Sequence, residues 1–235
     1  MIITHRPDVN PDDYCYDTGL VFGKDAAKTL LNKIATSQAD LLQGVIDNEQ
    51  EYKETAKHNT FTQTKEIMRR KSQNKRLNKG LVHITSDQYV LPDNLRADLH
   101  KELPDWLLGL DADTTRTLAQ VSQGGDYFSI HSDSKRCSSM FMLLQGQNQE
   151  TRWYRNIKPF EIFNPARIPD HDKIEHVVTA VMQPYKWYVF NHAVWHGVTG
   201  FVDNGARIHV SLDFKNLSAQ DVVKAVKTNN RYTHE

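Results

Sequence analysis

The sequence lacks the features that would tie the protein to a membrane or to a disulfide framework. No apolar run approaches the roughly 20 residues needed to cross a bilayer, and no signal peptide is recognisable. The two cysteines, Cys15 and Cys137, lie far apart in the chain. We therefore expect a cytoplasmic protein with free thiols and no membrane association.

An excess of charge of one sign is also missing. The 29 basic and 29 acidic residues give a formal net charge of zero, so the composition creates no global attraction to nucleic acid. The exception is residues 53–79, which carry nine Lys or Arg against two Glu. This basic segment is either a solvated face or a contact surface for an anionic substrate or nucleic acid. Phe61 is its only residue suited to stacking on bases, which disfavours nucleic acid.

The chain has no internal repeat, and its 235 residues suit a single compact domain, 1–235. Residues 1–116 read as a helical support region, with apolar periodicity over 24–57, a short strand near 20–22, a strand near 81–91 and a capped helix before Pro104. Residues 117–214 form short β-type runs and predict an antiparallel jelly-roll core. Residues 215–235 are a C-terminal extension whose end, 227–235, reads as a frayed tail. The runs are 117–123, 126–131, 137–145, 151–155, 159–163, 176–182, 186–191, 194–199 and 206–214.

A histidine and an aspartate stand two residues apart at the end of the strand-like run 124–133. Side chains of a strand alternate with period two, so His131 and Asp133 would point to the same face and could bind one metal ion. A lone His-x-Asp triplet is weak support for a metal site. A third ligand is needed, and His196 offers it at the start of a later strand.

The run 207–214 alternates cleanly between apolar and polar residues. Such a strand can pack its apolar face on helices while its polar face lines a cavity. Two imidazoles and one carboxylate form the facial triad that leaves open positions on Fe(II) in non-haem oxygenases. The apolar positions are Ile208, Val210, Leu212 and Phe214, and the polar positions are Arg207, His209, Ser211 and Asp213.

The order His131-x-Asp133, His196, Arg207 resembles that of the Fe(II)/2-oxoglutarate-dependent dioxygenases, whose core is a jelly roll. The motif Gly125-x-x-Phe128-x-x-His131-x-Asp133 is similar to the prolyl-hydroxylase branch of that superfamily. The runs 190–191 and 195–198, Phe-Asn and Trp-His-Gly-Val, are also family-like. The resemblance covers about residues 117–214.

The resemblance implies His131, Asp133 and His196 as Fe(II) ligands and Arg207 as the residue that binds the far carboxylate of 2-oxoglutarate. A guanidinium suits this task because it binds a carboxylate through two parallel hydrogen bonds. Many relatives place Ser two residues after this arginine, where this chain has His209, with Ser211 two further on. Prolyl hydroxylases often have Tyr at the position of Phe128. The second carboxylate contact is therefore assigned to Tyr127, expected on the face of His131, with Ser211 as a further candidate.

Three residues are candidates for substrate contacts. Arg136 either faces the cavity mouth or caps a turn. Arg152 and Tyr154 belong to the aromatic- and arginine-rich segment 147–175, which is either a substrate lid or a packed loop. His192 is excluded as a ligand because, on one strand with His196, it would lie roughly 13 Å away.

Three functions remain open. The first is hydroxylation of an amino-acid, peptide or protein side chain, with O2 and 2-oxoglutarate as co-substrates and succinate and CO2 as products. The second is a nucleic-acid hydroxylase or demethylase of the same superfamily, which the absence of further arginines between Arg207 and Asn216 disfavours. The third is a non-catalytic metal-binding jelly-roll module. Because Asp133 is present, the resemblance implies hydroxylation or demethylation rather than halogenation.

Overall fold

The structure, a computed structural model, describes residues 1–38, 85–91, 93–110, 117–123, 127–133, 136–146, 148–158, 169–200 and 207–230. The basic segment 53–79, the helical pattern beyond residue 38 and the strand expected at 159–163 lie outside these residues. Among the described residues, no helix is long and apolar enough to cross a membrane.

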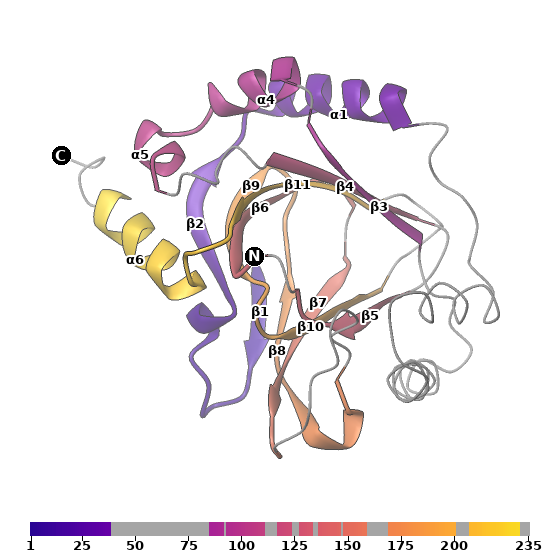
Figure 1. Cartoon of the computed structure of the whole chain (residues 1–235), viewed down its shortest axis with the longest axis vertical. Coiled ribbons are helices and arrows are strands. Elements are labelled where there is room, and N and C mark those ends of the chain that lie inside the picture. The colour runs from indigo at the N-terminus through magenta and orange to yellow at the C-terminus, as the bar shows by residue number, and fades with distance from the viewer. Residues whose placement is uncertain are drawn as a thin grey trace.

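Two antiparallel sheets face each other across the molecule (Figure 1). The smaller sheet has the order β1 (Ile2–His5), β8 (Ile174–Val181), β7 (Glu150–Asn156), β10 (Trp195–Thr199), β5 (Tyr127–His131). The larger sheet has the order β2 (Cys15–Val21), β9 (Lys186–Asn191), β6 (Ser138–Gln145), β11 (Arg207–Phe214), β4 (Thr117–Gln123), β3 (Thr85–Val90).

The path of the chain from β4 to β11 is that of a jelly roll. It passes from one sheet to the other at every step except between β7 and β8, which are neighbours in the smaller sheet. Two sheets connected in this way enclose a core between their inner faces. The predicted jelly-roll core, also called a double-stranded β-helix, is therefore confirmed by the strand order.

Helices cover the outer face of the larger sheet (Figure 1). They are α1 (Lys24–Gln38), α4 (Asp93–His100), α5 (Asp105–Leu108) and α6 (Ala219–Asn230). The apolar side chains of β11 pack with these helices in one cluster, which includes Ile34, Leu99, Val210 and Val222, each fully buried. The alternation predicted for 207–214 is therefore confirmed. The apolar face of β11 packs on helices, and its polar face is turned to the space between the sheets.

A second cluster fills the space between the sheets. Phe141 on β6, Trp153 on β7 and Tyr188 on β9 pack together there, and all three are at most 2% exposed. The Trp153 indole donates to the backbone oxygen of Asn191 at 3.3 Å. This packed core borders the cavity with the polar inner-face residues, because Phe141 and Phe190 belong to both.

The ends of the chain are more ordered than the sequence suggests. Residues 1–21 add β1 to the smaller sheet and β2 to the larger one. The expected frayed tail is wrong up to Asn230, because α6 extends that far. Its start is a capping box in which Ser218 Oγ donates to Asp221 Oδ2 at 2.7 Å and accepts from the Asp221 N–H at 3.2 Å.

Candidate metal centre

Three side chains predicted as ligands converge at one end of the sandwich. His131, Asp133 and His196 each offer one donor atom, and these atoms lie within 4.8 Å of one another. His131 and His196 are direct partners in the pairing of β5 with β10, and their ring centroids are 4.4 Å apart. Side chains of paired residues stand on the same face of a sheet, so the register itself brings both imidazoles together.

Both imidazoles are oriented by their own strands. His131 Nδ1 lies 2.7 Å from the carbonyl oxygen of Ser129, and His196 Nδ1 lies 2.9 Å from that of Val194. A carbonyl only accepts, so Nδ1 carries the proton and Nε2 keeps its lone pair. Burial lowers the pKa of both rings, that of His196 well below its usual value. Each ring is thus neutral at pH 7, the form that binds a metal.

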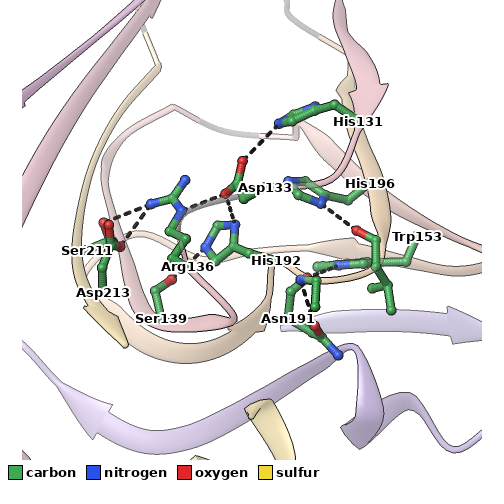
Figure 2. A network of polar contacts seen from close by, with 12 residues as sticks. His131, Asp133, Arg136, Ser139, Trp153, Asn191, His192, His196, Ser211 and Asp213 are labelled. Atoms are coloured by element: carbon green, nitrogen blue, oxygen red, sulfur yellow. Dashed lines mark hydrogen bonds and ion pairs between the residues drawn. The ribbon is translucent and has the colours of Figure 1, made fainter. Parts of the chain in front are cut away.

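The two oxygens of Asp133 have different surroundings (Figure 2). Oδ1 faces His131 Nε2 at 3.8 Å, whereas Oδ2 lies 2.6 Å from Arg136 Nε and 2.9 Å from His192 Nδ1. Burial raises the pKa of this carboxyl, but His192 and Arg136 outweigh burial and hold the pKa below its usual range. Asp133 is therefore an anion at neutral pH.

Arg136 connects this carboxylate to a second one on β11. Its Nη1 donates to Asp213 Oδ1 at 2.9 Å, and Ser211 Oγ donates to the same oxygen at 2.9 Å (Figure 2). The Arg136 side chain is 10% exposed and also lines the cavity beside the triad. The structure thus places Arg136, expected as a substrate contact or a turn cap, between the half-buried carboxylate of Asp133 and the buried carboxylate of Asp213.

His192 lies closer to the site than the sequence suggested. Its ring centroid is 5.4 Å from that of His196, which corrects the expected separation of roughly 13 Å along one strand. The reason is that β9 ends at Asn191 and the chain turns before β10 begins at Trp195. The Asn191 side chain accepts from the Ala193 N–H at 3.0 Å, and such Asx turns are the signal that could have predicted this bend.

A cavity next to the triad contains Arg207 and His209 from β11. Both are buried, at 6% and 4% exposure, and the guanidinium lies over the Phe141 ring at 5.1 Å. Arg207 Nε and His209 Nδ1 have no hydrogen-bond partner among the described residues. Burial lowers the pKa of Arg207 to about 10, so it stays protonated at pH 7. The cavity wall is formed by Gln120, Phe128, His131, Arg136, Phe141, Phe190, His192, His196, Val198, Arg207 and His209.

The two residues expected as second carboxylate contacts are not part of this wall. A bulge between His196 and Val198 pairs Val198 with Phe128, so Phe128 lies on the side of His131. The expectation that Tyr127 shares the face of His131 is therefore wrong, and Tyr127 is buried at 2% exposure. Ser211 is 1% exposed and donates to Asp213 instead. His209, named at first only for departing from the family pattern, lines the cavity in their place.

Arg152 and Tyr154 lie on the opposite face of the smaller sheet from the triad. In the pairing of β7 with β10, Trp153 opposes His196 and Tyr154 opposes Trp195. Neighbouring side chains of a strand point to opposite faces, so Tyr154 and Arg152 point away from the cavity. Arg152 forms an ion pair with Glu150 at 2.6 Å. Within the segment 147–175, the residues 150–156 thus form a central strand and not a lid. Residues 159–168 of this segment lie outside the described residues.

No family model matches the sequence, and no curated protein matches it either. Several solved structures resemble the fold at low identity. HygX from Streptomyces hygroscopicus, solved with nickel, 2-oxoglutarate and hygromycin B, is 9% identical with a TM-score of 0.43, over 89% of this chain and 86% of HygX. A Pseudomonas putida prolyl-4-hydroxylase is 11% identical with a TM-score of 0.40, over 86% of this chain and 91% of the hydroxylase.

Other solved structures are matched over less of their length. The epimerase SnoN, solved with Fe3+, alpha ketoglutarate and nogalamycin RO, is 10% identical with a TM-score of 0.40, over 62% of this chain and 72% of SnoN. The chain spans 47% of Peruvianin-I, a cysteine peptidase from Thevetia peruviana latex, and 33% of E. coli ycfD. The assignment of the fold depends on the strand order of this chain, not on these likenesses.

Proposed function

We propose that this chain is an Fe(II)- and 2-oxoglutarate-dependent dioxygenase that hydroxylates an amino-acid, peptide or protein side chain. In the balanced reaction, O2 and 2-oxoglutarate are consumed. One oxygen atom enters a C–H bond of the substrate and the other enters succinate, with release of CO2. The choice of substrate class is supported by the resemblance of the motif around His131 to the prolyl-hydroxylase branch.

The observation that carries the proposal is Arg207 in the same cavity as the triad. A buried charge is normally paired, since leaving it alone costs free energy. Among the described residues no carboxylate pairs with Arg207, and burial is the cause of its lowered pKa. An anion from outside the chain would complete the site, and a dicarboxylate that also reaches the triad fits both features.

The donor set of the triad fits iron. Two neutral imidazoles with free Nε2 atoms and one ionised carboxylate are the ligands of the non-haem Fe(II) triad, which leaves positions open. Bound iron would supply the activation of O2 that couples decarboxylation of the keto acid to hydroxylation. His131, Asp133 and His196 would hold the metal.

The remaining cavity residues bind and shield the co-substrate. Arg207 would bind the far carboxylate through two N–H groups. We assign the second contact to His209, whose buried Nδ1 has no partner among the described residues, in preference to Tyr127 or Ser211. Gln120, the partner of His209 on β4, lines the same wall. Phe128, Phe141 and Val198 supply apolar walls that exclude water from the reacting groups.

The proposal is tested by anaerobic addition of Fe(II) and 2-oxoglutarate, followed by a substrate panel read out as released succinate. We expect the weak visible charge-transfer band of the keto-acid chelate, and its loss in His131→Ala. His5→Ala is the matched control, because His5 lies exposed on the edge strand β1. Turnover of 2-oxoglutarate by His131→Ala at the rate of the unmodified protein would refute the site.

The panel also separates the alternatives. Succinate released with oligonucleotides but not with peptides or amino acids would replace the substrate class by nucleic acid. Metal and 2-oxoglutarate binding without succinate under any condition would favour the non-catalytic module.

A further inference from the structure

One oxygen of the Asp133 carboxylate is already engaged from two sides. Arg136 Nε lies 2.6 Å from Oδ2 and His192 Nδ1 lies 2.9 Å from it. The other oxygen, Oδ1, is the one turned toward His131 Nε2 (Figure 2). The two oxygens of this ligand are therefore not equivalent.

Both partners of Oδ2 are fixed by contacts of their own. His192 Nε2 lies 2.8 Å from Ser139 Oγ on β6, and its ring stacks on Phe190 with centroids 4.4 Å apart. Arg136 is held from its far end by Asp213, whose side chain is 4% exposed. The backbone of the ligand is fixed as well, because the Asp133 N–H donates to the carbonyl of His192 at 3.0 Å. A carboxylate held in this way has little freedom to rotate.

We propose that His192 and Arg136 are positioning residues that occupy Oδ2 of Asp133, so that Oδ1 alone is presented to the metal. The inference rests on the proposed function, since it concerns the same site. A free carboxylate can bind a metal through one oxygen or through both. Asp133 would then give the metal one oxygen and each histidine one nitrogen, which would leave room for a chelating keto acid and O2.

The two positioning residues contribute in different ways. His192 contributes through the close approach of its Nδ1 to Oδ2, 2.9 Å, although this contact lacks the alignment of a hydrogen bond. Arg136 places a positive charge between Asp133 and Asp213 and offers donors in a rigid plane, which suits two carboxylates at once. Lysine at position 136 has neither the reach in two directions nor the planar fork, so it would not replace arginine.

The first test compares His192→Phe with the unmodified protein, using Mn(II) and Co(II) as metal probes without co-substrate. We expect Mn(II) to bind about 10–100-fold more weakly, the usual effect of removing a partner of a metal ligand. The visible d–d bands of Co(II) should change, because Oδ2 loses one of its two partners and the carboxylate can rotate. His192→Asn keeps an N–H donor near the position of Nδ1 and should restore both readouts to within a few-fold of the original.

The matched control is His100→Phe. His100 also has a half-buried ring with a hydrogen bond, 3.0 Å from Nε2 to Thr117 Oγ1, but it belongs to α4 on the outer face of the larger sheet. It should leave Mn(II) affinity and the Co(II) spectrum unchanged.

The second test removes the guanidinium. Arg136→Met alone leaves the buried Asp213 without its charged partner and is prone to misfolding. The double variant Arg136→Met/Asp213→Asn removes both charges and keeps an acceptor for Ser211. It should also weaken Mn(II) binding about 10–100-fold, while Arg96→Met on α4, which pairs with Asp93 on the outer face of the larger sheet, has no effect.

The outcomes separate this inference from the proposed function. Mn(II) affinity and a Co(II) spectrum unchanged in His192→Phe would overturn the positioning role, even if the protein releases succinate. Altered affinity and spectrum would support it, even if no hydroxylated product is found. No binding of Mn(II) or Co(II) by the unmodified protein would overturn the metal site itself.

Discussion

His131 and His196, far apart in the sequence, are direct cross-strand partners with ring centroids 4.4 Å apart. Pairing of β5 with β10 is therefore sufficient to bring two of the three ligands together. Anything that shifts this register by one residue would turn one imidazole to the outer face of the sheet. The proposed metal binding therefore depends on the integrity of this strand pair.

Replacing Arg207 by Met should separate stability from binding. The change removes a buried cation without a carboxylate partner among the described residues, so the ligand-free protein should become more stable. The gain should be about 1–4 kcal/mol, the range for apolar replacement of buried ionic groups. 2-Oxoglutarate should bind at least about 30-fold more weakly, equal to about 2 kcal/mol. Urea unfolding and calorimetric titration measure the two effects. Lower stability with unchanged 2-oxoglutarate affinity would contradict the role of Arg207.

The metal-free protein should lose stability as the pH falls below about 6.5. Burial, and next the charge of Arg207, hold the pKa of His209 well below its usual value in the folded state. The folded state therefore binds fewer protons than the unfolded state, and stability is present above the unfolded pKa and lost below it. The loss is up to about 1.4 kcal/mol per pH unit for each such group. Thermal unfolding between pH 8 and 5.5 should show a flatter slope for His209→Gln, and an identical slope would count against the prediction.

Gly197→Ala should loosen the pair of strands that carries both histidines. A Cβ at position 197 would lie 3.0 Å from the carbonyl oxygen of Phe128 and 3.4 Å from Ile130 Cγ1, both on β5. We expect a loss of roughly 1–3 kcal/mol from overpacking, together with weaker Mn(II) binding. Gly23→Ala is the control, because its added Cβ would meet only Ala26 Cβ at 4.0 Å. Unchanged stability and metal affinity in Gly197→Ala would contradict the prediction and would mean that β5 shifts to accommodate the added methyl group.

Ser218→Ala should destabilise the protein without touching the site. The hydroxyl caps α6 through its bonds with Asp221, and loss of such a cap costs about 1 kcal/mol. Urea unfolding should show this decrease, and Lys224→Ala on the exposed side of α6 should show little. A change in Mn(II) affinity of Ser218→Ala would mean that α6 is coupled to the metal centre.

Parts of the site could be predicted because they depend on local periodicity. The two-residue alternation of β11 separates Arg207 and His209 from Ile208 and Val210, and the structure places the two pairs on opposite faces. The spacing of His131 and Asp133 likewise brings both side chains into one cluster that could hold a metal ion. Such patterns are written in the sequence because a strand repeats every two residues.

Other parts of the site could not be predicted because they depend on where a strand is interrupted. Because of the bulge in β5, Phe128 lies on the cavity side, where Tyr127 was expected. The turn after Asn191 brings His192 against Asp133. The segment with Arg152 is a central strand, because it pairs with both β8 and β10.

The sequence by itself determined the β-rich core and the pair His131 and Asp133, which follow from residue type and short-range spacing, while His196 and Arg207 were expected from the family resemblance. Only the tertiary structure decided which oxygen of Asp133 faces His131, that Arg136 bridges two carboxylates, and that His209 rather than Tyr127 reaches the cavity. These are contacts between strands far apart in the chain. They are fixed by register, bulges and burial, which long-range packing sets and local patterns do not encode.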